Sequence, residues 1–186
     1  FSGIFVMGAL ISILTTTIDR KLEQLRRGRS RVIESGHTVI LGWGDEILVL
    51  IKELVTANEN HANSCIAILA DEDKIKMESR IYEAIGPQKN TRIICRSGNS
   101  SIILDLNLVS INTAKSIVIL GVATDITGLA IMKSVLSIIK NPDRRVEPYH
   151  IVAAIDNPKI IDSLKLISKD EIEVIYKSEF ITKIEA

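Results

Sequence analysis

The chain has 186 residues, of which 46% are apolar and 25% are charged, and its 23 basic and 23 acidic side chains leave no net formal charge. This length and balance allow one folded domain with a core and a short appendage, and they exclude an intrinsically disordered chain. A neutral chain gives no overall indication of an acidic substrate or a nucleic-acid partner, and we expect no nucleic-acid binding.

The first predicted element is an apolar helix over residues 1–18, which runs directly into a basic segment. The 18 residues carry no charged side chain, whereas residues 19–34 hold six Lys/Arg and three acids. A stretch of this length is about the minimum that crosses a bilayer core of ~30 Å, and Lys and Arg follow membrane helices on the cytoplasmic side. The junction predicts the last turns of a membrane helix leading into a cytoplasmic domain. Because the chain starts at Phe1 rather than Met, we expect further membrane segments to precede it.

Two alternatives remain open for residues 1–18. Three threonines and two glycines make the segment only moderately hydrophobic, so it could be a buried core helix. A secretory signal is disfavoured, because its charged region would precede the apolar run and no A-x-A-like cleavage site follows.

From residue 36 onward, short β-branched runs alternate with amphipathic helical patterns. Nearly continuous apolar runs of this kind are typical of strands covered on both faces. The predicted strands are 37–41, 64–69, 91–95, 116–120, 150–155 and 173–176. The predicted helices are 46–57, 74–85, 103–108, 126–139 and 159–167. This alternation predicts a Rossmann-type, doubly wound α/β fold with a mainly parallel six-stranded sheet.

The two cysteines, Cys65 and Cys95, each lie inside a predicted strand. We therefore expect buried free thiols rather than a disulfide. The three histidines are scattered, and no C-x-x-C or H-x-x-x-H pattern accompanies them, so no histidine or cysteine metal site is predicted.

A candidate cofactor-binding turn follows the first predicted strand. Gly42, Trp43 and Gly44 precede a helix there, and glycines in this place let the backbone approach a pyrophosphate. Ile47 occupies the position expected for the third glycine of the dinucleotide fingerprint. Asp71 follows the second strand, where an acid commonly binds the ribose hydroxyls. NAD or an adenine nucleotide is thus a candidate cofactor; alternatively, the glycines only make a tight turn and Asp71 caps the next helix.

More candidate site residues follow the later strands, at the same carboxyl edge of the sheet. Arg96 and Gly98 come after the third strand, and Arg96 could bind a phosphate or pair with Asp71. Asp71, Asp125 and Asp156 follow three different strands and could together hold Ca²⁺, which takes roughly six to eight oxygen ligands. Because most of these acids precede a helix, helix capping is their alternative role.

Catalytic patterns are missing from the sequence, which has no Y-x-x-x-K, G-x-S-x-G, Walker A or H-E-x-x-H motif. The chain also ends about ten residues after the last predicted strand, which leaves no room for a substrate domain. We expect no catalytic residues and no enzymatic activity.

Three stretches carry a family resemblance: residues 25–43 (LRRGRSRVIESGHTVILGW), 94–98 (ICRSG) and 105–120 (DLNLVSINTAKSIVIL), with weaker agreement over 150–157. With the apolar helix end and the basic linker, they resemble the pore–gate junction of channels regulated by an RCK (TrkA-N-like) domain. The chain looks most like the Castor/Pollux type, first described as ion channels of plant nuclear envelopes.

The resemblance implies that residues 1–18 are the C-terminal part of a pore-lining transmembrane helix, 19–35 a basic helical linker and 36–186 the N-terminal Rossmann lobe of an RCK domain. It implies a homotetrameric potassium or calcium channel with a gating ring, whose regulatory domain is cytoplasmic (at the nuclear envelope in a plant member). A ligand at the carboxyl edge of the sheet would then open the pore. The alternatives are an NAD-binding domain of an oxidoreductase and a nucleotide-sensing subunit of a potassium transporter.

Overall fold

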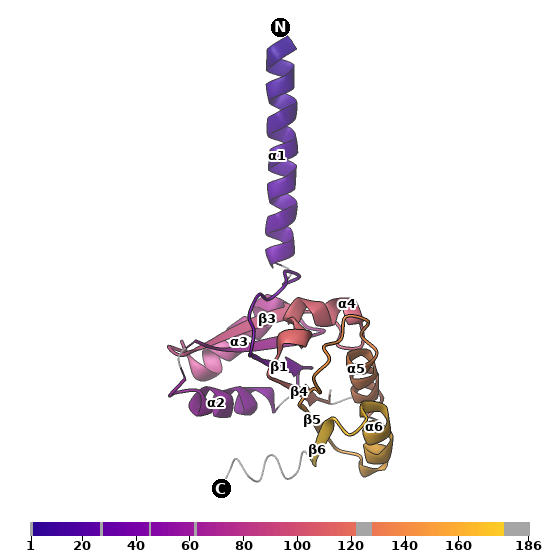
Figure 1. Ribbon diagram of the computed structural model, residues 1–186. Helices are drawn as coiled ribbons and strands as arrows, with labels where there is room; N and C mark the ends of the chain where they lie inside the picture. The colour runs from indigo at the N-terminus through magenta and orange to yellow at the C-terminus, as the bar shows by residue number, and fades with distance from the viewer. Residues whose placement is uncertain (1, 27, 45, 62, 122–127, 177–186) are drawn as a thin grey trace.

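The structure is a computed structural model that describes residues 2–26, 28–44, 46–61, 63–121 and 128–176 (Figure 1). Helix α1 (Ser2–Arg26) extends away from an α/β domain that contains the remaining described elements. The domain is built on one sheet, whose strands are β1 (Thr38–Leu41), β2 (Ser64–Ala70), β3 (Thr91–Ser97), β4 (Ser116–Leu120), β5 (Ile151–Ile155) and β6 (Ile172–Tyr176).

The sheet has the strand order β3-β2-β1-β4-β5-β6, and every pairing is parallel. The chain moves outward from β1 to β3, then returns to start β4 on the other side of β1. This arrangement confirms the predicted Rossmann-type fold, and it places a topological switch point at the carboxyl ends of β1 and β4.

Helices cover both faces of the sheet, because successive strand residues point to opposite sides. Ile40 packs with α2 (Ile47–Ala57) and α3 (Lys74–Ile85) in one core, while Val39 and Leu41 belong to the other. The second core includes residues of α5 (Leu129–Ile139) and α6 (Ile161–Ser168). Figure 1 shows α2 and α3 on the opposite side of the sheet from α5 and α6. The interior is therefore two apolar layers on one parallel sheet.

The connection from β3 to β4 is less helical than predicted. Helix α4 covers only Ile103–Leu106 and is followed by two 3₁₀ turns, η1 (Asn107–Val109) and η2 (Ile111–Thr113). Ser110, between the turns, has a left-handed φ of 48°, which ends regular helix. Elsewhere the predicted strands and helices agree with the structure to within a few residues. The last connection begins with a third 3₁₀ turn, η3 (Pro158–Ile160); residues 126 and 127 of one predicted helix lie outside the described residues.

The apolar part of α1 is not a buried core helix. Its described side chains, residues 6–19, are all exposed, with Val6 at 60% and Ile13 at 67%. Within the described residues, however, no helix combines the length and the apolarity needed to cross a membrane. The helical linker predicted over 19–35 is helical only as far as Arg26, since residues 28–36 lie on the domain in non-helical backbone and Gly28 has a φ of 67°.

Candidate functional site

The turn after β1 is shaped by glycine at the switch point of the sheet. Gly42 has a φ of 103°, and its N–H donates to Leu69 O at 2.9 Å. A Cβ at Gly42 would lie 2.5 Å from Leu120 O, closer than any side chain tolerates, so the backbones of β1 and β4 approach each other tightly here. Glycine is therefore needed at residue 42 for the tight turn after β1 and for the close approach of β4.

The chemistry of the same turn does not fit a pyrophosphate as well as its shape does. The carboxylate of Glu46 lies against Gly44, 2.8 Å from the position of a Cβ there. Ile47, in the place of the third glycine, is the first residue of α2 and is buried in the core, and Trp43 packs against that core too. A negative charge beside the turn opposes phosphate binding. The acidic side chain beside the turn thus opposes an anionic ligand.

Asp71 and Arg96 do not form the ion pair considered from the sequence; no salt bridge joins them in the described part of the chain. Asp71 is exposed, and the cap of α3 is Asp73, which accepts from the N–H groups of Ile75 and Lys76 at 2.9 and 3.1 Å. Arg96 is half-buried and donates to two backbone carbonyls, those of Ser30 and Cys95. Burial lowers the pKa of the Arg96 guanidinium. Arg96, for which the sequence suggested a phosphate or Asp71 as the partner, instead donates to the carbonyl of Ser30.

Gly98 is buried, and a carboxylate occupies the space that a side chain at this residue would need. Its N–H donates to Ala70 O at 2.9 Å, and a Cβ would lie 2.9 Å from Oδ2 of Asp105. Asp105 was not singled out from the sequence, although it lies inside one of the three resembling stretches. Gly98 therefore makes room for Asp105 within the loop after β3.

The calcium hypothesis for Asp71, Asp125 and Asp156 stays a prediction. Asp125 lies outside the described residues, and Asp71 and Asp156 are both exposed. Among the residues that the structure describes, no three His, Cys, Asp or Glu side chains gather closely enough to hold a metal ion. The nearby Asn157, rather than Asp156, accepts from the N–H of Lys159 at the start of η3.

The linker, residues 28–36, is bonded along its length to the β3–β4 connection. Val32 is buried, its N–H donates to Leu108 O at 2.8 Å, and its carbonyl accepts from the Ser110 hydroxyl. Further on, the N–H of Gly36 donates to Thr113 O at 2.8 Å. The sequence predicted this segment as a connector, and the structure shows it to be a docked part of the domain.

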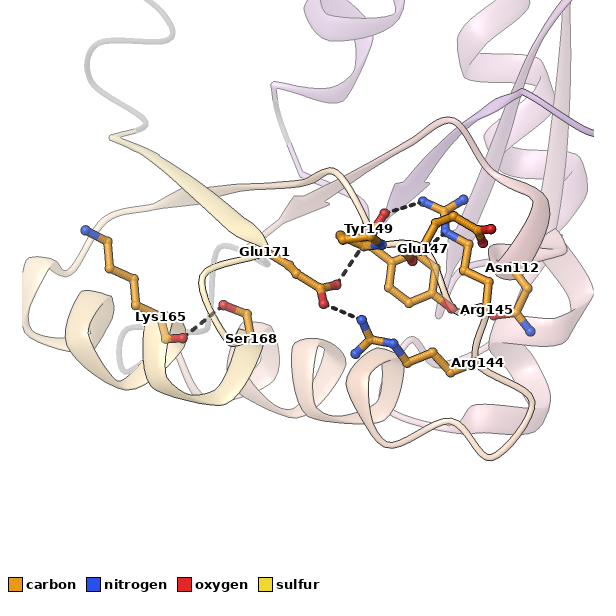
Figure 2. Close-up of polar contacts among 9 residues, drawn as sticks. Asn112, Arg144, Arg145, Glu147, Tyr149, Lys165, Ser168 and Glu171 are labelled. Carbon is orange, nitrogen blue, oxygen red and sulfur yellow. Dashed lines mark hydrogen bonds and ion pairs between the residues drawn. The ribbon is translucent and has the colours of Figure 1, made fainter.

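A second polar cluster lies at the amino edge of the sheet, before β5 and β6 (Figure 2). Glu171 accepts from Arg144 and from the N–H of Tyr149, and the Tyr149 hydroxyl donates to Asn112. Arg145 lies over the Tyr149 ring, 4.5 Å from its centroid, and donates to the carbonyl of residue 114 at 2.7 Å. The members satisfy one another, so the cluster fixes the loop 141–149 rather than presenting groups to a ligand.

The buried thiols are inert members of the core. Cys65 and Cys95 are free and buried, as expected from the sequence. Burial raises the pKa of Cys65 to about 11 and that of Cys95 to about 12, with a smaller contribution from the charge of Glu78 in the second case. Burial therefore favours the protonated form of both thiols at neutral pH, which is the less reactive form of cysteine.

Comparison with curated proteins finds similarity to plant ion channels. The chain is 33% identical over 186 residues to "Probable ion channel CASTOR" of Oryza sativa subsp. japonica. This alignment covers 98% of this chain and 20% of that protein. The chain is 32% identical to "Ion channel CASTOR" of Lotus japonicus and 35% identical, over 119 residues, to "Probable ion channel POLLUX" of Arabidopsis thaliana. The chain thus spans about a fifth of the length of the CASTOR proteins. No protein-family model matches it.

Comparison with solved structures confirms the fold. The GsuK channel bound to NAD aligns with a TM-score of 0.57 at 16% identity, over 91% of this chain and 27% of that chain. The TrkA-N domain of the inner membrane protein ybaL from Escherichia coli aligns with a TM-score of 0.52 at 16% identity, over 83% and 96%. GsuK bound to ADP aligns with a TM-score of 0.53 at 16% identity, over 91% and 39%. At this identity the likeness establishes the Rossmann-type architecture and nothing finer.

Proposed function

We propose, from its similarity to the CASTOR and POLLUX ion channels, that the chain is the regulatory domain of a cation channel with the end of a membrane helix attached. In this proposal a ligand at the carboxyl edge of the sheet changes the position of the linker, and the linker moves α1. Four copies would surround one pore. The curated relatives are ion channels and not enzymes, which sets the oxidoreductase alternative aside.

The observation that carries the proposal is the direct contact between the linker and the carboxyl end of β3. Arg96, near the carboxyl end of β3, donates to Ser30 O in the linker. A Cβ at Gly28 would lie 3.2 Å from Ser97 N, so the linker backbone also approaches the end of β3 closely. A ligand can shift an equilibrium only through contacts that differ between two states. Here the carboxyl end of β3, which is part of the candidate ligand edge, contacts the linker that leads to α1.

The exposure of α1 supports its role as the end of a membrane helix. An isolated helix with large apolar side chains exposed on all described sides gains no stability from the domain and requires an apolar environment. Since it does not reach spanning length and apolarity by itself, we propose that it continues a longer membrane segment of the whole protein. The basic residues that follow it support a cytoplasmic location of the domain.

Two classes of ligand are considered for the carboxyl edge, a nucleotide and a divalent cation. Solved GsuK structures are bound to NAD and to ADP, and the Gly42 turn lies at the switch point of the sheet, where open α/β sheets bind ligands. The Glu46 carboxylate beside Gly44 opposes a phosphate and would instead favour a cation. Ca²⁺, NAD⁺ and ADP are therefore the three probes to compare.

The test uses the 186-residue chain in detergent. Each probe is titrated calorimetrically, and amide hydrogen exchange is then measured with and without it. We expect one probe to bind and to change the exchange of the Val32 and Gly36 amides, which are bonded to the β3–β4 connection. Amides of the loop 86–90, at the opposite end of β3, are the internal control. A probe that binds without changing the linker, or the lack of binding by all three, would contradict the proposal.

A variant then locates the bound ligand. Asp71→Asn and Asp156→Asn are expected to weaken Ca²⁺ binding if Ca²⁺ is the ligand, because each removes a carboxylate at the carboxyl edge. Glu46→Gln is expected to strengthen ADP binding about fivefold, because it removes a negative charge next to the glycine turn. Glu53→Gln, on the exposed side of α2, is the matched control for the loss of one acid.

A further inference from the structure

The side chain of Asp105 joins two segments that are far apart in the sequence. One carboxylate oxygen, Oδ1, accepts from Nη2 of Arg29 in the linker at 2.6 Å. The other, Oδ2, accepts from the N–H of Asn99, in the loop after β3, at 2.8 Å. Asp105 is 5% exposed, so these two partners replace the water that a carboxylate would otherwise bind.

The loop that Asp105 holds is part of the carboxyl edge of the sheet. It begins at Gly98, whose missing side chain makes room for the Asp105 carboxylate. It continues through Ser101, whose N–H donates to the Asn99 side chain at 2.8 Å, and its residue 102 starts the turn into α4. A displacement of this loop therefore changes the hydrogen bond to Oδ2 directly.

A second ion pair attaches the linker elsewhere and provides a comparison. Nη2 of Arg92 lies 2.6 Å from Oε1 of Glu34, the same distance as in the Arg29–Asp105 pair. Arg92 is near the amino end of β3, and the loop at the carboxyl edge takes no part in this pair. One pair thus holds the linker to the amino end of β3 and the other holds it to α4, beyond the carboxyl end of β3; of the two acids, Asp105 is the one that also bonds the carboxyl-edge loop.

We propose that Asp105 is the positioning residue that couples the carboxyl-edge loop to the linker. Its two oxygens hold the loop and Arg29 together, so that loosening one partner loosens the other. A ligand that reorganises residues 98–102 would release Arg29, and with it the segment that leads to α1. This inference deepens the proposed function and rests on it for the ligand, but the coupling itself exists without any ligand.

The experiment therefore measures the coupling in the ligand-free 186-residue chain. Amide hydrogen exchange of Asn99 is followed by NMR in the wild type, Arg29→Gln, Asp105→Asn and the double variant. We expect Arg29→Gln to speed the exchange of Asn99 about three- to tenfold, because a half-exposed charged partner strengthens the carboxylate acceptor by a modest amount. In the Asp105→Asn background, Arg29→Gln should have no further effect. Arg29→Lys, which keeps the charge, should restore part of the protection.

The matched control is Arg92→Gln, which removes the other ion pair of the linker. It should leave the exchange of Asn99 unchanged. Equal effects of Arg29→Gln and Arg92→Gln, or additive effects of Arg29→Gln and Asp105→Asn, would overturn the proposal. Arg29 is 51% exposed, so its variant keeps the fold even if Asp105→Asn does not. Failure of all three probes to bind would refute the ligand-sensing function, yet it would leave this coupling measurable.

Discussion

Arg96 and Ser30 lie 66 residues apart in the chain and are joined by a hydrogen bond from Nε of the guanidinium to the Ser30 carbonyl. The same guanidinium donates from Nη1 to Cys95 O at 2.8 Å. One side chain of the edge strand β3 therefore fixes the linker to the sheet.

Replacing Arg96 by Met should destabilise the domain, because two part-buried carbonyls lose a charged donor while the aliphatic packing is kept. We expect a loss of about 1–2 kcal/mol in the free energy of unfolding. Urea denaturation measures it. Arg80→Met, on an exposed position of α3, is the control and should cost less than about 0.5 kcal/mol. Equal losses in the two variants would show that the linker contacts contribute nothing.

Replacing Gly42 by Ala should destabilise the fold strongly. The new Cβ would lie 2.5 Å from Leu120 O, and the residue would keep a φ of 103°. We expect a loss of about 2–4 kcal/mol, from backbone strain and from the forced separation of β1 and β4. Gly86→Ala is the control, since Gly86 has a φ of 67° but open space around it; it should cost about 1 kcal/mol. Similar values for both would mean that the close approach at Gly42 is not rigid.

Stability should fall at alkaline pH in a way that depends on Cys95. Burial raises the pKa of its thiol from 9.0 to about 12, so the folded protein keeps the proton that the unfolded chain loses. The stabilisation is complete below the unfolded pKa and is lost as pH rises from there through the folded pKa. We expect the wild type to lose about 1 kcal/mol more than Cys95→Ala between roughly pH 8 and pH 10.

The comparison of two urea denaturation series tests this pH dependence. Lysines and tyrosines titrate in both proteins, so the difference between the two slopes isolates the thiol. Parallel slopes would show that Cys95 ionises in the folded protein as easily as in the unfolded chain.

Deleting residues 1–26 should leave the domain stable, because the described apolar side chains of α1 are exposed to solvent. We expect the free energy of unfolding to change by less than about 0.5 kcal/mol, and binding to lipid vesicles in a flotation assay to be lost. Deleting residues 1–36 is the informative contrast.

The longer deletion also removes the buried Val32 and the hydrogen bonds of the linker. It should cost about 3 kcal/mol or more. If both truncated chains unfolded at the same urea concentration, the linker would not be an energetic part of the domain.

The sheet could be predicted from the sequence because each strand is an apolar run bounded by turn residues. The prediction of β3 stopped at Cys95, yet the strand continues to Ser97. Arg96 and Ser97 pair in register with Leu69 and Ala70, and a polar side chain does not prevent backbone pairing. In the β3–β4 connection a helix was predicted over 103–108, but the α-helix ends at Leu106 and a 3₁₀ turn follows, a change of hydrogen-bond pattern that the apolar periodicity does not distinguish.

The glycine turn at Gly42 and Gly44 was also predictable, because its location after a strand and before a helix follows from the pattern alone. The coupling of the linker to the carboxyl-edge loop could not be predicted from the sequence. Its acceptors include backbone carbonyls, such as those of Ser30 and Val32, and a carbonyl has no sequence signature. Asp105 and Arg29 are 76 residues apart, so only the folded topology brings them together.

The long sequence separation of the linker contacts also sets an order of assembly. The linker precedes all six strands in the chain, but its partners extend to Thr113, after β3. During synthesis it can dock only when the whole first half of the sheet has been made. Contacts of this range form late and slowly, because they must close a long loop. The docking of the linker is therefore among the last steps in the assembly of this half of the molecule.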